Sequence, residues 1–181
     1  MIQEIIDNLD RKINFVDKPN GFVEFIADKD GKKRPAKHLG NGKFKDVTNF
    51  GKKVLTSYWR FDGDVRQAPV QGLTVKQRIY KRVYKLKLIV VGEKGKCYYE
   101  DSLIDNILIE IDECKTDLKK YLGLQKLDIQ VKGYSTDREK IGKQEYTQDF
   151  KYKMNYLVLS TDIEVSIEFD TNCLKEDCYG V

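Results

Sequence analysis

Histidine is the usual proton acceptor for a serine or cysteine nucleophile, and this chain has one, His38. It lies in Ala36-Lys37-His38-Leu39-Gly40, a basic, glycine-containing segment of the kind found in exposed loops. We therefore interpret His38 as a surface residue rather than a catalytic base. The adjacent Gly40-Asn41-Gly42-Lys43 lacks the Gly-x-x-x-x-Gly-Lys-Ser/Thr spacing of a phosphate-binding loop, so we interpret it as a turn.

One pattern is typical of metal-dependent nucleases, which hold a divalent ion with carboxylates on adjoining strands. Asp128 is followed by Gln130-x-Lys132 on a predicted strand, but the preceding acidic candidates, Asp112 and Glu113, fall in a predicted helix. Alternating polar residues on the wet face of a sheet would produce the same string. We therefore expect no catalytic residues, no metal ion, no cofactor and no enzymatic activity.

The four cysteines, Cys97, Cys114, Cys173 and Cys178, do not indicate a disulfide framework or a zinc site. Cys173 and Cys178 are five residues apart, which is wider than the usual zinc-binding Cys-x-x-Cys pair. The start of the chain also lacks the basic and apolar segments of a secretory signal, so an oxidising compartment is not expected. We interpret the cysteines as buried or unreactive thiols.

A basic, tyrosine-bearing strand is the best candidate for binding. Its basic residues can attract phosphates and its tyrosine rings can stack on nucleic-acid bases. An exposed edge strand with lysines that discourage aggregation would explain the same composition, so this alternative remains open. The basic residues are Lys76, Arg78, Lys81, Arg82, Lys85 and Lys87, interleaved with Tyr80 and Tyr84.

The net charge of +4 conceals an uneven distribution along the 181 residues. Residues 1–96 carry 22 basic and 11 acidic side chains (+11), whereas residues 97–181 carry 11 basic and 18 acidic ones (−7). This asymmetry predicts two unlike surfaces or a polyanionic partner. Alternatively, folding interleaves the two halves and mixes their charges on one surface. A hydrophobic content of 40% suits a globular protein, and no apolar run is long enough to span a membrane.

Hydrophobic periodicity predicts the elements that position these residues. Helical spacing predicts a short N-terminal helix over 2–13 and a long amphipathic helix over 102–122, with an apolar stripe that includes Leu108. Strands are predicted over 22–27, 54–61, 78–91, 127–132 and 156–170, and residues 134–153 are expected to form a mobile loop or hairpin tip.

We therefore predict an α+β fold, with the long helix packed on one face of a mostly antiparallel sheet. One domain spans residues 1–181, with 1–27 and 54–181 as its core and 28–53 as a basic, β-rich loop or arm.

The layout resembles that of the tail-terminator, tail-completion and head–tail connector proteins of tailed bacteriophages. The resemblance covers about half of the chain and rests on the strand Tyr84-Lys85-Leu86-Lys87-Leu88-Ile89-Val90, the helix 102–122 and the strand 157–169 with its ending Thr171-Asn172-Cys173. It is a likeness of architecture, without shared motif residues, and the basic segment 28–60 departs from the compact core of the family.

The resemblance implies a non-enzymatic virion structural protein that forms a homo-oligomeric ring and contacts portal, connector or tail proteins. The basic strand would then face DNA or a neighbouring subunit, and an acidic surface formed by Asp162, Glu164 and Glu168 would face the next subunit. The strand 157–169 could also extend a neighbour's sheet. The alternative is a small nucleic-acid-binding accessory protein that uses the basic strand and the 32–53 arm.

Overall fold

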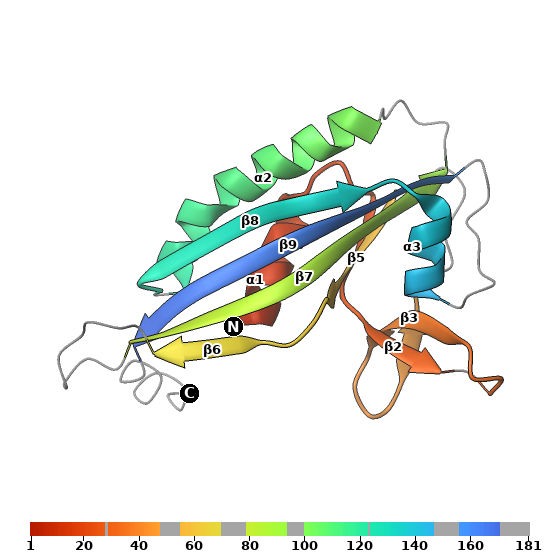
Figure 1. Ribbon diagram of the computed structural model, residues 1–181, viewed down its shortest axis with the longest axis horizontal. Coiled ribbons are helices and arrows are strands. Elements are labelled where there is room, and N and C mark those ends of the chain that lie inside the picture. The colour runs from red at the N-terminus through yellow and green to blue at the C-terminus, as the bar shows by residue number, and fades with distance from the viewer. Residues whose placement is uncertain are drawn as a thin grey trace.

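The computed structural model describes residues 1–27, 29–47, 55–69, 79–93, 100–122, 124–146 and 156–170. These residues form an α+β fold built on a mostly antiparallel sheet (Figure 1). The helices are α1 (Ile2–Lys12), α2 (Glu100–Tyr121) and α3 (Arg138–Glu145). The strands are β1 (Lys18–Phe22), β2 (Glu24–Ala27), β3 (Lys33–His38), β4 (Phe44–Asp46), β5 (Thr56–Phe61), β6 (Arg66–Pro69), β7 (Ile79–Glu93), β8 (Lys126–Ser135) and β9 (Tyr156–Asp170).

The large sheet is ordered β1-β5-β7-β9-β8, with β6 also paired to β7. All of its pairs are antiparallel except β1 with β5. The strands β7 and β9 are each 15 residues long and pair along their whole length. Residues 160–168 of β9 pair with β7 on one side and with β8 on the other. The expectation that strand 157–169 extends a neighbour's sheet is therefore wrong for this stretch, and β8 is the outer strand at this side of the described sheet.

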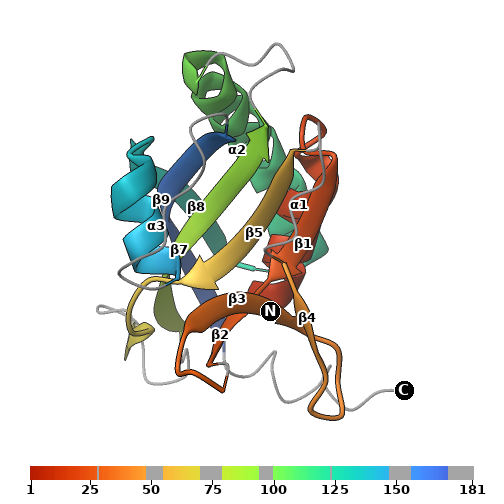
Figure 2. The same cartoon turned by 90° about the vertical axis from the view of Figure 1, so that its right-hand side faces the viewer.

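The helices α1 and α2 cover one face of the large sheet (Figures 1 and 2). Strand alternation directs Leu86, Leu88 and Val165 into this core, where they meet the predicted stripe of α1. The expected single long amphipathic helix is not confirmed, because the described residues form three helices and Leu108 of the predicted stripe on α2 is 44% exposed. The α2 side chains that do enter this core are Leu103, Ile104, Ile107, Ile111, Cys114 and Leu118.

The opposite face of the large sheet is covered at one end by α3 and by a second, three-stranded antiparallel sheet, β2-β3-β4. Ile89 and Val158 of the large sheet pack there against Ile141 of α3 and Val47, which follows β4. The small sheet corresponds to the predicted basic arm, but it also takes in β2, which was assigned to the core.

The helix α3 replaces part of the loop expected over 134–153. The side chain of Asp137 caps it by accepting hydrogen bonds from the backbone nitrogens of Glu139 and Lys140, both at 3.0 Å. A polar composition concealed this helix, because Ile141 is its one large apolar residue and it is buried. None of the helices in the described ranges combines the length and apolar character required to cross a lipid bilayer.

Candidate interaction surfaces

The predicted basic and acidic surfaces lie side by side on the sheet face opposite α1 and α2. Lys81 is directly across from Glu168, Lys85 from Glu164 and Lys87 from Asp162 in the β7–β9 register. The Nζ of Lys87 is 3.1 Å from an Asp162 carboxylate oxygen. We call these six residues and their two partners on β8, Lys126 and Lys132, the charged face.

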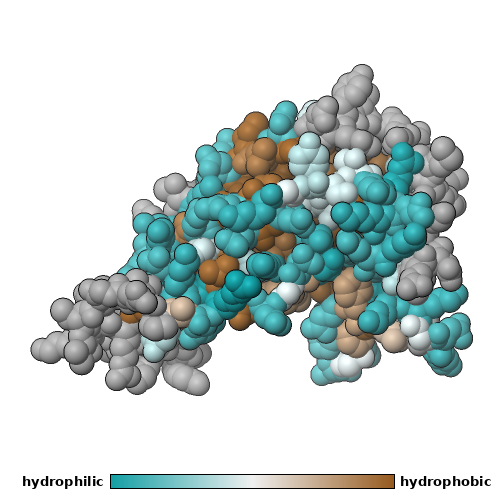
Figure 3. Space-filling model, in the orientation of Figure 1, coloured by the Kyte–Doolittle hydropathy of each residue, from teal (hydrophilic) through white to brown (hydrophobic). Residues whose placement is uncertain are grey.

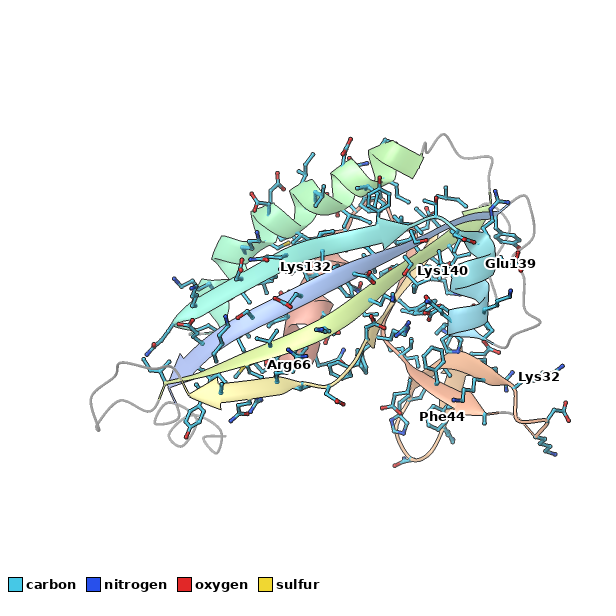
Figure 4. The ribbon with its side chains drawn as sticks, viewed as in Figure 1. Lys32, Phe44, Arg66, Lys132, Glu139 and Lys140 are labelled. Carbon is cyan, nitrogen blue, oxygen red and sulfur yellow. The ribbon has the colours of Figure 1, made fainter. Side chains whose placement is uncertain are left out.

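The two lysines of β8 lie on the other side of the acidic row. Lys126 is 3.8 Å from Glu168, and Lys132, which is visible on β8 in Figure 4, is 3.6 Å from Glu164. Asp162, Glu164 and Glu168 therefore each have a lysine of the same subunit beside them. For these residues the alternative that folding interleaves the two halves of the chain describes the geometry, because their opposite charges lie next to one another.

The other members of the predicted basic strand lie elsewhere. Arg82 is on the α1 and α2 side of the sheet, where it donates two hydrogen bonds to Gln67 Oε1, and its guanidinium carbon is 5.1 Å from the ring centroid of Phe169. Lys76 and Arg78 lie outside the described residues. The structure thus brings together three of the six basic residues and separates a fourth.

A buried ion network joins α3 to the end of the charged face. The carboxylate of Glu145 is fully buried and accepts hydrogen bonds from Arg60 at 2.7 and 2.8 Å and from the Tyr58 hydroxyl at 3.2 Å. Arg60 also bonds Asp62, which in turn accepts a bond from Lys87 at 3.2 Å. These residues hold α3 against β5, and sequence analysis missed them because they are separated by about 85 positions.

The electrostatics of this network favour its charged forms. Burial opposes the charge on Arg60, but bonding and attraction to Glu145 outweigh burial, so the pKa of Arg60 is raised. Burial raises the pKa of the Asp62 carboxyl, but Lys87 and Arg60 together lower it below its usual value. The network therefore favours the charged forms of Arg60 and Asp62, and both of its carboxylates are already bonded to basic side chains.

The antiparallel hairpin formed by β3 and β4, which we call the basic hairpin, carries charges of a different kind. Among the described residues, no ion pair to Lys33, Lys43 or Lys45 is found. Lys37 and Lys45 are directly opposite each other across the two strands, an unfavourable arrangement for like charges. Exposed Phe44, labelled in Figure 4, packs its ring edge-on against His38 with 4.9 Å between centroids. Although Arg34 pairs with Asp46 at 3.0 Å, the hairpin therefore combines three lysines that have no ion pair among the described residues with exposed apolar surface.

A shallow groove lies between α2 and β8, on the far side of the molecule from the basic hairpin. Its volume is about 540 Å³. Leu108 and Ile109 are 44% and 55% exposed, and apolar side chains interrupt the hydrophilic surface over the middle of α2 in Figure 3. Its lining comprises Leu108, Ile109, Ile111, Asp112, Lys115, Ile129, Gln130 and Val131. We call it the α2–β8 groove.

An acidic cluster ties α1 to the sheet. Asp10 accepts a hydrogen bond from the Trp59 indole nitrogen at 2.6 Å. The Asp7 carboxylate and the Lys37 ammonium lie close to the position that a β-carbon at Gly21 would occupy. Gly21 has φ +70°, which favours glycine, and its backbone nitrogen donates to Asp10. Burial raises the pKa of Asp10 to about 6, against the opposing effects of the Trp59 and Gly21 hydrogen bonds.

Most residues of the nuclease-like pattern are engaged with one another or with neighbouring lysines. Asp112 and Gln130 border the α2–β8 groove, but Asp112 pairs with Lys115 at 3.0 Å and Gln130 forms hydrogen bonds with Asp128 and Lys132. Within the described ranges, no three acidic, histidine or cysteine side chains form a group suited to a metal ion. His38 is exposed and its Nδ1 accepts a hydrogen bond from the Gly40 nitrogen at 3.3 Å.

Cys114 is buried in the core between α2 and the sheet, whereas Cys97, Cys173 and Cys178 lie outside the described residues.

No protein-family model matches the chain, and no curated protein matches its sequence.

Proposed function

We propose that this chain is a non-enzymatic virion structural protein, a ring-forming subunit of the head–tail connector or tail terminator of a tailed bacteriophage. The proposal combines the architectural resemblance with one observation: two regions of opposite charge, each bearing exposed apolar residues, lie on opposite sides of the subunit. A subunit that closes a ring needs two such unlike, complementary surfaces.

The two regions account for much of the uneven charge along the chain. Residues 29–47, which contain the basic hairpin, carry seven basic and two acidic side chains. The α2 segment, Glu100–Tyr121, carries seven acidic and three basic ones. Electrostatic complementarity between such surfaces fixes the orientation of neighbouring subunits.

The assembly is tested by light scattering coupled to size-exclusion chromatography and by electron microscopy of the purified chain. We expect closed rings at about 0.1 M salt and their partial dissociation near 1 M, where the screening length falls from about 10 Å to about 3 Å. A chain that stays monomeric at every salt and protein concentration tested would contradict the proposal. Neighbouring genes for portal, capsid or tail proteins would support the assignment to a virion.

One observation favours a second function, a small nucleic-acid-binding accessory protein. Lys33, Lys43 and Lys45 of the basic hairpin form no ion pair with the described residues, and Phe44 beside them is 40% exposed and available for stacking. Under this function, Lys43→Glu with Lys45→Glu abolishes binding to a fluorescent oligonucleotide, whereas Lys81→Ala with Lys85→Ala, on the charged face, leaves binding nearly unchanged. Absence of measurable binding by the unmodified chain at low salt would eliminate this candidate.

A further inference from the structure

We propose that the tip of the basic hairpin, residues 38–45, of one subunit occupies the α2–β8 groove of the next subunit. This inference rests on the ring-forming function proposed above and names the contact that builds the ring. It gives the exposed apolar residues at both sites a common role. A subunit that carries both a tip and a groove on opposite sides can add neighbours head to tail until the ring closes.

The hairpin tip has a fixed shape before it meets a partner. The Leu39 nitrogen donates to the Lys43 carbonyl oxygen at 2.8 Å, and the Lys43 nitrogen donates to the Gly40 carbonyl oxygen at 3.0 Å. Gly40, Asn41 and Gly42 all have positive φ, which makes the turn tight. Leu39 is 58% exposed on this turn. A preformed tip loses little conformational entropy on binding, which favours its use as an insert.

The groove is suited to a compact loop rather than to an added strand. Leu108, Ile111 and Val131 give it an apolar lining, and its volume of about 540 Å³ exceeds that of one leucine side chain. The outer strand β8 bulges between Val131 and Gly133, with Lys132 as the additional residue. A bulge and a lysine both hinder strand addition at a sheet edge, so direct pairing of two β8 strands is disfavoured.

Charge selects the orientation of this contact. Lys43 and Lys45 flank the tip, and exposed Asp105, Asp112 and Glu113 lie along α2. Insertion of the tip brings these opposite charges together. Figures 1 and 2 show the β3–β4 turn projecting at the end of the molecule opposite α2, so one subunit cannot satisfy its own groove.

The test uses two variants of the full chain, Leu39→Asp at the tip and Leu108→Asp in the groove. Each variant retains one intact half of the interface, so each should be monomeric alone, with association at least about tenfold weaker than in the unmodified chain. An equimolar mixture should give dimers but no rings, because a single tip–groove pair can form. The matched control is Val65→Asp, a substitution at another exposed apolar residue, which should leave the rings intact.

The outcomes separate this contact from the ring function. If both the unmodified chain and Leu39→Asp form rings, the tip–groove contact is overturned and the ring function stands. If the unmodified chain forms no rings, both proposals are overturned. A photoreactive amino acid at position 39 provides an independent readout that does not depend on a disruptive substitution. It should cross-link to residues 108–115 or 129–131 of another subunit, which line the groove, and cross-links confined to other segments would overturn the contact.

Discussion

The buried carboxyl of Asp10 makes the stability of the fold depend on pH. This carboxyl lies between α1 and the large sheet, where it accepts the Trp59 indole hydrogen bond at 2.6 Å. Its pKa is raised from 3.8 to about 6, chiefly by burial. Asp10→Asn removes the titration and retains an oxygen that can accept the same bond. The variant therefore isolates the effect of ionising this group.

The size of the effect follows from the pKa difference between the folded and unfolded states. Because the folded-state pKa is higher, the folded chain holds this proton more tightly. The contribution of Asp10 to stability is complete below about pH 4 and is lost as the pH rises through about 6. A difference of about two pKa units corresponds to roughly 3 kcal/mol lost by pH 7.

The assay is urea unfolding, followed by tryptophan fluorescence, at intervals from pH 4 to pH 7. Relative to the original chain, Asp10→Asn should gain roughly 3 kcal/mol of unfolding free energy between pH 4 and pH 7. Glu24→Gln, at an exposed position on β2, is the control and should show no comparable trend. A constant difference between Asp10→Asn and the original chain across this range would refute the reasoning.

Two further substitutions test how α3 is held. Glu145→Gln leaves the Arg60 charge buried without its carboxylate and should cost about 3–5 kcal/mol of unfolding free energy. The double variant Glu145→Gln with Arg60→Met should lose less unfolding free energy than the sum of the losses in the two single variants. Additive losses, measured by urea unfolding, would argue against a stabilising Arg60–Glu145 ion pair. Asp137→Ala removes the N-terminal cap of α3 and should cost about 1 kcal/mol, whereas Asp137→Asn should retain most of that stability. Equal unfolding midpoints for the two Asp137 variants would show that the cap does not contribute.

Sequence patterns predicted the elements whose apolar residues repeat regularly. The α1 stripe, α2 over most of its length, and β7 and β9 follow from periods of about 3.6 and 2 residues. Hydrophobic periodicity could not predict α3, because one large apolar residue among eight defines no repeat. The only local signal for its start is Asp137, a residue type that commonly caps helices. Periodicity also missed β6, which is four residues long.

The candidate surfaces were predicted in part. The basic character of the hairpin is evident from composition, and its Gly40-Asn41-Gly42 turn was correctly interpreted. The groove was missed because Leu108 fits the same helical stripe as the buried residues of α2. Whether the Leu108 side chain is exposed depends on how α2 packs against β8, which the sequence does not show. The Arg60–Glu145 pair was missed because nothing local marks residues that meet across about 85 positions.

The sequence by itself determined the regular elements, the α+β class and the separation of basic from acidic residues along the chain. These features depend on local periodicity and composition, which do not require knowledge of distant neighbours. Tertiary structure decided which charges remain unneutralised. The β7–β9 register places Lys85 beside Glu164, whereas the basic hairpin and α2 are held apart on opposite sides. Strand register brings together residues that are about 80 positions apart, and this pairing distinguishes the charged face, where lysines lie beside carboxylates, from the basic hairpin and α2.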